Sequence, residues 1–108
     1  MQVTQLPSVL KMIQDKKLAL SVFGDRAPFH CGLIKHLDTS GDTIRIWLYG
    51  MNYAYPLPIA VSSVQNINVM VQEEDIVINL IPLGITLAVS GTKAQISALF
   101  HLLNERND

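Results

Sequence analysis

The sequence contains little cysteine and little charge, and both shortages narrow what the protein can be. Cys31 is the single cysteine among 108 residues. A lone thiol excludes an internal disulfide and a cysteine-rich zinc site, and it is compatible with a reducing compartment. Charged residues make up 16% of the chain, against about 25% in typical globular domains. A surface so poor in charge predicts that a second subunit covers part of it, so we expect a homo-oligomer.

The chain also lacks the long apolar runs of membrane and secreted proteins. It has no uninterrupted apolar stretch of about 18 residues, the length that a spanning helix needs. Its first residues lack the basic, apolar and small-residue pattern of a secretory signal. We therefore expect a soluble, cytoplasmic protein with no membrane partner. The length of 108 residues suits one domain, so residues 1–108 are interpreted as a single domain.

No group of residues predicts catalysis, a metal site or a cofactor. The six glycines are dispersed, so there is no glycine-rich phosphate loop, and no serine or cysteine lies in a nucleophile motif. His30 and Cys31 are neighbours on an expected strand and would point to opposite faces, while His36 would lie roughly 20 Å from His30 along that strand. We expect a non-enzymatic protein without metal or cofactor.

The net charge of −1 excludes a general electrostatic attraction to nucleic acid. The charge is nevertheless uneven along the chain. Residues 1–54 carry six basic and four acidic residues, which gives +2, and residues 55–108 carry two basic and five acidic residues, which gives −3. Any nucleic-acid binding must therefore be local, and the basic excess lies in the first half.

Hydrophobic periodicity predicts a helix followed by strands in this first half. Apolar residues spaced like one helix face are Leu6, Val9, Leu10 and Ile13. This helix is expected to end near Lys16 and Lys17, because alternation with a period of two begins at Leu18. A second strand is expected from Phe29 to Leu37 and a polar turn over residues 38–42.

The third expected strand, residues 43–49, contains the only tryptophan. Ile44, Ile46 and Leu48 would share one face of it, and Arg45 and Trp47 would share the other. Trp47 is compatible with two interpretations. It either lies exposed beside Arg45, at a subunit interface or under a stacking ligand, or it packs under the N-terminal helix, which is the favoured interpretation.

The second half of the chain predicts further strands and a final helix. Pro56 and Pro58 each lack an amide donor, so residues 50–58 are expected as a loop or edge strand. The strands expected after it are residues 59–61, 64–71, 76–81 and 85–90, the last two joined as a hairpin through residues 82–84. Thr92 and Gln95 match a capping box, which predicts a helix over residues 93–104.

The segment from Pro7 to Leu48 resembles the first motif of the Sm-like proteins. Phe29, Gly32, Asp38 and Asp42 occupy its apolar, glycine, aspartate and polar positions, and Val64 and Ile67 fit the end of the second motif. The resemblance implies an Sm-like, SH3-like small barrel over residues 5–71. The fold class is thus expected to be mainly β with terminal helices, with a β-hairpin and helix over residues 72–108 as an extension.

The resemblance also implies an oligomeric ring whose pore holds RNA. In Sm-like proteins the turn between the two polar positions lines this pore, which assigns Asp38, Ser40 and Asp42 to it. Ala60 and Val61 stand where the family has an Arg-Gly pair. Basic contacts would come from elsewhere, namely from Lys35, Arg45 and Arg26, with Lys16 and Lys17, and with Tyr49, Tyr53 and Tyr55 as stacking residues.

Three alternatives remain open from the sequence. Asp38 and Asp42 could simply accept hydrogen bonds within their turn. The whole chain, with about seven strands and a C-terminal helix, also resembles pleckstrin-homology-like modules, which would bind peptide or lipid as a monomer. Such a module would use Ile96, Leu99, Phe100 and Leu103 to close its barrel end. A purely structural assembly protein is the third alternative.

Overall fold

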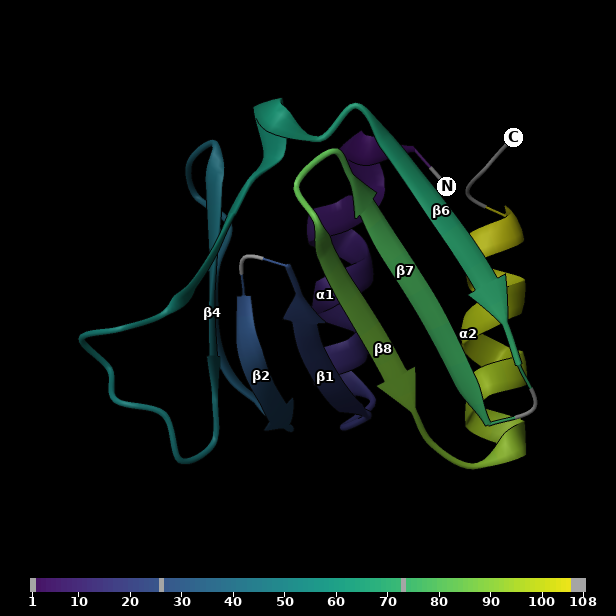
Figure 1. The fold of residues 1–108 in the computed structure, drawn as a ribbon. Coiled ribbons are helices and arrows are strands. Elements are labelled where there is room, and N and C mark those ends of the chain that lie inside the picture. The colour runs from purple at the N-terminus through teal and green to yellow at the C-terminus, as the bar shows by residue number, and fades with distance from the viewer. Residues whose placement is uncertain (1, 26, 73, 106–108) are drawn as a thin grey trace.

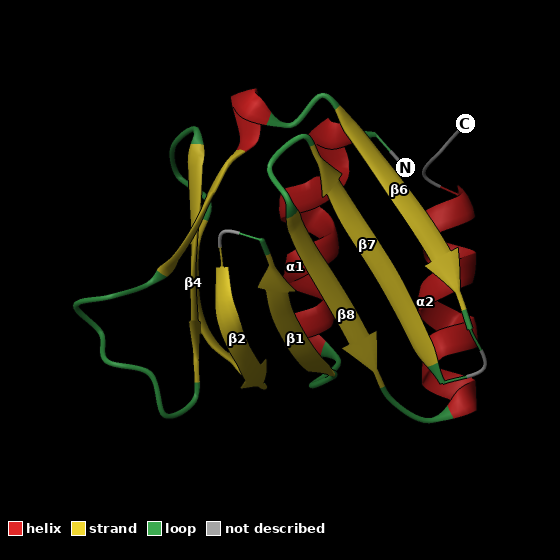
Figure 2. Cartoon of the chain, in the orientation of Figure 1, coloured by secondary structure: helices red, strands yellow, loops and turns green. Residues whose placement is uncertain are grey.

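The computed structural model describes residues 2–25, 27–72 and 74–105. Over these residues the chain forms eight strands, with an α-helix before the first strand and another after the last, and two short 3₁₀ helices. Both α-helices lie on the same side of one sheet (Figures 1 and 2). The elements, in chain order, are η1 (Val3–Gln5), α1 (Leu6–Asp15), β1 (Ala19–Gly24), β2 (Ala27–Gly32), β3 (Ile34–Asp38), β4 (Thr43–Leu48), β5 (Leu57–Ala60), η2 (Val61–Ser63), β6 (Asn66–Val71), β7 (Asp75–Ile81), β8 (Ile85–Ser90) and α2 (Lys93–Glu105). The mainly β class with a helix at each end is confirmed.

The strands form two antiparallel sheets and not a closed barrel (Figure 1). The larger sheet has the order β2-β1-β8-β7-β6, and the smaller sheet has the order β3-β4-β5. The expected barrel over residues 5–71 does not close, because β8 pairs with β1 along all six residues. The hairpin β7–β8, expected as part of an extension, thus lies between β1 and β6 inside the larger sheet.

The strand expected over residues 29–37 is two strands, one in each sheet. Gly32 ends β2 with φ of +151°, a backbone conformation that other residues rarely adopt. After Leu33 the chain continues as β3 in the smaller sheet. The sharp bend that a glycine within a strand predicts is therefore present, and it joins the two sheets.

Helix α1 packs with its whole apolar face in the core. The side chains that share this face are fully buried, and they are Leu6, Val9, Leu10 and Ile13. The helix ends at Asp15, and Lys17 then takes a left-handed conformation with φ of 55° before β1 begins. The predicted helix and its predicted end near Lys16 and Lys17 are confirmed.

Helix α2 begins at the predicted capping box. The Thr92 amide donates to Gln95 Oε1 over 2.8 Å, and the Gln95 amide donates to Thr92 Oγ1 over 3.2 Å. Ile96, Leu99 and Leu103 are buried in the same core cluster as α1 and both sheets. Helix α2 packs against β7, so it covers part of the larger sheet.

The segment between β4 and β6 differs in detail from the prediction. The expected strand over residues 59–61 is β5, four residues from Leu57 to Ala60, at the edge of the smaller sheet. Pro58 lies opposite Arg45 in this edge strand, as its missing donor requires. The chain then forms η2 and enters β6 only at Asn66. The gap between the strands expected over residues 59–61 and 64–71 is thus filled by a single 3₁₀ turn, Val61–Ser63.

Candidate nucleic-acid interface

The turn after β3 is held by Asp38. Its Oδ1 accepts hydrogen bonds from the Ser40 amide, over 3.0 Å, and from the Ser40 hydroxyl, over 2.7 Å. These two hydrogen bonds, the hydroxyl bond first, lower the pKa of Asp38 below its ordinary value of 3.8, with smaller contributions from Arg45 and His36. The carboxylate and hydroxyl that the resemblance assigned to an RNA pore are therefore bonded to each other.

Asp42 connects this turn to a distant segment. Its carboxylate accepts hydrogen bonds from the Ser62 amide, over 3.1 Å, and the Ser62 hydroxyl, over 2.8 Å. Its main-chain oxygen accepts from the Val61 amide over 3.0 Å. Asp42 thus holds η2 against the start of β4. Asp38 thus accepts within its own turn, as one interpretation of the sequence expected, whereas Asp42 accepts from a segment 20 residues away.

Arg45, one of the two arginines predicted to contact RNA, lies beside Asp38. Arg45 Nη1 lies 3.8 Å from Asp38 Oδ2, so part of its charge is balanced. Arg26, the remaining predicted arginine, lies outside the described residues. The predicted residues therefore divide into the Asp38, Ser40 and Arg45 group, the separate Asp42 contact, and Lys35 near the other end of β3.

Lys35 is displayed by a β-bulge. Ile34 pairs with Leu48, whereas His36 pairs with Trp47, so two residues of β3 advance against one of β4. Lys35 is the additional residue. A bulge changes the direction of the side chains beside it, and bulges are frequent next to functional sites. Both Lys35 and His36 are consequently exposed in succession, which a regular strand with one buried face would not allow.

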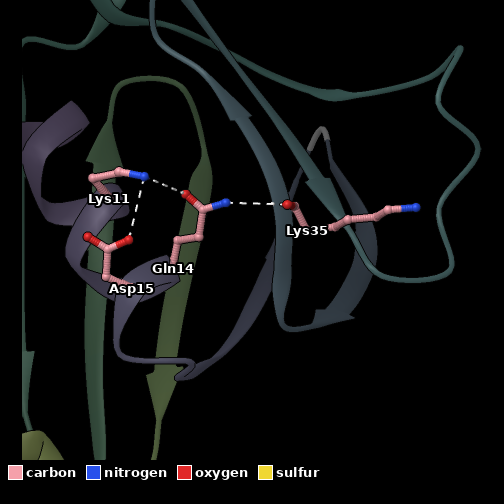
Figure 3. Close-up of polar contacts among 4 residues, drawn as sticks. All are labelled: Lys11, Gln14, Asp15 and Lys35. Atoms are coloured by element: carbon pink, nitrogen blue, oxygen red, sulfur yellow. Dashed lines mark hydrogen bonds and ion pairs between the residues drawn. The ribbon is translucent and has the colours of Figure 1, made fainter.

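The first of two cavities beside Lys35 lies toward α1. It has a volume of about 300 Å³, and its lining includes Lys17, Lys35 and Tyr49. The Lys35 ammonium lies 6.0 Å from the centre of the Tyr49 ring, within the range of a cation–π contact. Gln14 Nε2 donates to the main-chain oxygen of Lys35 over 3.3 Å, which fixes the helix against the bulge, and the Lys35 side chain extends away from α1 (Figure 3).

The second cavity lies on the other side of Lys35 and is aromatic. It has a volume of about 390 Å³ and is lined by Lys35, His36, Trp47, Met51 and Tyr53. The Trp47 and Tyr53 rings are stacked, with centres 5.0 Å apart and planes at 14°. The His36 ring lies 5.0 Å from Trp47 in a tilted arrangement. Lys35 is thus the one residue that lines both cavities.

Trp47 itself contradicts both sequence-based interpretations. It lies on the face of β4 opposite Ile44, Ile46 and Leu48, so it does not pack under α1. It is also not exposed, because only 6% of its surface is accessible. Tyr53 and His36 cover it, and its indole Nε1 donates to the Tyr53 main-chain oxygen over 2.8 Å. The loop after β4 folds back over the tryptophan.

We call this surface the Lys35 face and define it by five side chains: Lys17, Lys35, His36, Tyr49 and Tyr53. Tyr49 and Tyr53 are 64% and 72% exposed, so their rings are available for stacking. Within the described part of the chain, neither Lys17 nor Lys35 forms an ion pair, unlike Lys11 with Asp15 and Arg45 with Asp38. Its positive charge is therefore not balanced by a neighbouring carboxylate there.

The lysines and tyrosines of this face were predicted from the sequence as separate residues and not as one surface. Neither His36 as an aromatic member nor the bulge that exposes it was predicted. The pair His36 and Trp47 could have been found only from the strand register, which a single sequence does not specify. Lys16 and Tyr55, also predicted, are exposed but do not line either cavity.

Over residues 2–25, 27–72 and 74–105, no three His, Cys, Asp or Glu side chains come close enough to hold a metal ion. Neither helix, over the same residues, has the length and apolar character needed to cross a membrane. Comparison with protein-family models, with curated proteins and with solved structures found no match to this chain.

Proposed function

We propose that the protein is a non-enzymatic, homo-oligomeric binder of single-stranded RNA and that the Lys35 face is its binding surface. One observation carries the proposal: a bulge exposes Lys35 where it lines two cavities, one with the Tyr49 ring and one with the rings of His36, Trp47 and Tyr53. Bases stack on exposed aromatic side chains, and lysines between them contact the phosphates. The spacing of cation and rings on β3 and the loop after β4 suits this mode of binding.

The low net charge of the chain agrees with local and weak binding by one subunit. With a net charge of −1, the Lys35 face must act through Lys17 and Lys35 and not through a general positive field. An oligomer carries several such faces, and their combined avidity exceeds the affinity of each one. The proposed oligomer and the proposed ligand therefore support one another. We place this activity in the cytoplasm, where a lone cysteine is stable in the reduced state.

The resemblance to Sm-like proteins supports RNA as the ligand, although at a different surface. The side chains that would line an Sm-like pore, Asp38 and Asp42, are engaged in hydrogen bonds with Ser40 and Ser62. Their negative charge would also oppose a phosphate. We therefore propose that RNA contacts the Lys35 face and not the turn between these aspartates.

The test measures the binding of a labelled single-stranded oligoribonucleotide by fluorescence anisotropy at several salt concentrations. Tyr49→Leu and Tyr53→Leu remove one exposed ring each. Tyr53→Leu leaves the main-chain oxygen that accepts from Trp47. Each loss of stacking is expected to weaken binding by about 1–3 kcal/mol. Tyr55→Leu is the matched control, because Tyr55 is as exposed as Tyr53 but lines neither cavity.

Lys35→Gln tests the electrostatic part of the proposal. It should weaken binding and reduce the slope of log affinity against log salt by about 0.7, the value for one phosphate contact to a single strand. Lys93→Gln removes one positive charge from α2, on the larger sheet, and should leave the slope unchanged. No binding at low salt, or equal effects of Lys35→Gln and Lys93→Gln, would contradict the proposal.

A second candidate function is that of a pleckstrin-homology-like module that binds peptide or lipid. The observation in its favour is the burial of Ile96, Leu99 and Leu103 of α2 in the common core, as a helix that closes the end of such a module requires. Phe100 is packed against the same core. If this candidate function is correct, the protein is a monomer that does not bind RNA. Binding to anionic phospholipid vesicles, without binding to RNA, would favour it.

A further inference from the structure

Strand β6 is an edge strand without the usual protection. Among the described strands it is the last of the larger sheet, where β7 is its only neighbour (Figure 1). Its residues Asn66–Val71 include no charged residue and no proline. It pairs with β7 in one unbroken register over all six residues, so no bulge interrupts Asn66–Val71. Monomeric proteins normally blunt such an edge with charge, proline or a bulge, because it is a template for another strand.

Strand β5, at one edge of the smaller sheet, offers a contrast within the same molecule. It has four residues, and its second residue is Pro58. Both features make an edge strand a poor template. The chain thus protects β5 and leaves β6 suited to pairing. The difference indicates that another strand pairs with the free edge of β6.

The hydrogen bond at the β6–β7 turn shows which backbone groups of β6 are free. The Gln72 amide donates to the Asp75 oxygen over 2.8 Å, so Gln72 faces β7. Backbone groups of an antiparallel strand face its two neighbours alternately. Asn66, Asn68 and Met70 therefore face β7 as well. The amides and carbonyls of Ile67, Val69 and Val71 point to the free edge.

We infer that β6 pairs with β6 of a second copy, antiparallel, about a two-fold axis at Val69. This register places Val69 opposite Val69 of the partner subunit, and it places Ile67 and Val71 opposite each other across the axis. It uses every free backbone group of the three residues and gives about six hydrogen bonds between the subunits. The two larger sheets then form one continuous sheet across the dimer.

The side chains of β6 suit this register on both faces of the sheet. Ile67 and Val69 already pack against the core, so their pairing across the axis extends an apolar surface. Val71, 44% exposed in one subunit, is covered by the partner's Ile67. On the outer face, Asn68 lies opposite the partner's Met70. Since β6 has no charged residue, its pairing with itself brings no like charges together.

The composition argues for a second copy as the occupant of this edge. The chain is poor in charge, at 16%, and so requires that some apolar surface be covered. Two of its exposed large hydrophobic side chains, Met70 and Val71, lie on β6 itself. A two-fold contact of a strand with itself is isologous and closes at two subunits. The inference thus specifies a dimer, where the resemblance implied a ring.

The test compares the mass of the wild type and of Val69→Pro by sedimentation velocity from low to high micromolar concentration. Proline at position 69 removes an amide that faces the free edge and leaves the β6–β7 hydrogen bonds in place. The wild type should be a dimer and Val69→Pro a monomer. Val69→Thr, which keeps the amide and the β-branched shape, should remain a dimer.

Cross-linking tests the register and does not depend on how well Val69→Pro folds. In a Cys31→Ser background, Val69→Cys places two thiols opposite each other, with Cα atoms about 5.5 Å apart, within the range of a disulfide. Val71→Cys places them four residues out of register, roughly 14 Å apart. The first variant should form a covalent dimer upon mild oxidation, and the second should not.

Several outcomes would overturn the inference: a monomeric wild type at the highest concentration, an assembly of more than two subunits, or a folded Val69→Pro that remains a dimer. Equal cross-linking of the two cysteine variants would do the same. The inference does not rest on the proposed function, because β6 and the Lys35 face belong to different sheets. A Val69→Pro monomer that still binds RNA weakly would support both proposals, and a dimer without RNA binding would support this one alone.

Discussion

The indole Nε1 of Trp47 donates a 2.8 Å hydrogen bond to the main-chain oxygen of Tyr53, and the two rings stack with centres 5.0 Å apart. Through this contact the loop after β4 folds over a tryptophan on the outer face of the sheet. The same contact presents the outer side of the Tyr53 ring to solvent beside Lys35. The Lys35 face therefore depends on a buried residue that the ligand is not expected to contact.

Replacement of Trp47 tests this dependence. Trp47→Phe keeps an aromatic ring but removes the indole donor, so the Tyr53 oxygen loses its partner. We expect the free energy of unfolding to fall by about 1–2 kcal/mol, measured by urea denaturation. RNA affinity should also fall, because Tyr53 is no longer held in one position. Tyr55→Phe is the control, since Tyr55 is 73% exposed, and it should change the free energy by less than about 0.5 kcal/mol. Equal stability of the two variants would contradict the assigned role of Trp47.

A second prediction concerns the contact between Gly24 and Gly84. Gly24 has φ of +149°, and a Cβ atom there would overlap the main-chain oxygen of Gly84, which accepts from the Asp25 amide. This close approach joins the end of β1 to the β7–β8 turn. Gly24→Ala must therefore separate two backbones, and we expect a loss of more than about 2 kcal/mol in the free energy of unfolding.

Gly41→Ala provides the matched control for Gly24→Ala. A Cβ atom at Gly41 meets nothing within 4 Å, and its φ is not positive. The substitution should change the free energy of unfolding by less than about 0.5 kcal/mol. Both variants are compared by thermal and urea denaturation. If Gly24→Ala proves as stable as Gly41→Ala, β1 does not pack against the β7–β8 turn as closely as described.

The elements of the fold could be predicted from the sequence because their signals are local. The helical spacing of Leu6, Val9, Leu10 and Ile13 and the capping box of Thr92 and Gln95 depend on residues within one or two turns. The strands from residue 76 onward followed in the same way from alternation and turn residues. Each of these segments was found within one or two residues of its bounds in the structure.

The arrangement of those elements could not be predicted, because it depends on pairing between distant strands. β1 pairs with β8 through residues that are more than 60 positions apart in the sequence. Local sequence patterns do not show whether this pairing or a smaller closed barrel forms. The bulge at Lys35 is likewise a mismatch between two strands. The candidate site was therefore predicted as separate residues and not as a surface.

A third prediction assigns Asp42 a structural role. Asp42→Ala removes the acceptor of two hydrogen bonds from Ser62, at 3.1 and 2.8 Å. Because the residue is exposed, the expected loss in the free energy of unfolding is only about 1 kcal/mol. RNA affinity should be unchanged, since Asp42 lies outside the Lys35 face. Thr39→Ala in the same turn is the control for stability. A marked change in RNA affinity for Asp42→Ala, in either direction, would mean that this turn takes part in RNA binding.

The final prediction concerns the titration of Asp38. The Ser40 hydroxyl and amide both donate to its carboxylate and lower its pKa below 3.8, and the nearby Arg45 contributes less. A pKa lowered in the folded state means that the contribution of Asp38 to stability is present above its unfolded pKa and is lost as the pH falls through the folded value. NMR titration of the side-chain carboxyl carbon measures this directly. Ser40→Ala removes the larger contribution and should raise the pKa of Asp38 more than Arg45→Gln does. The reverse order would mean that the ion pair, and not the turn, governs this carboxylate.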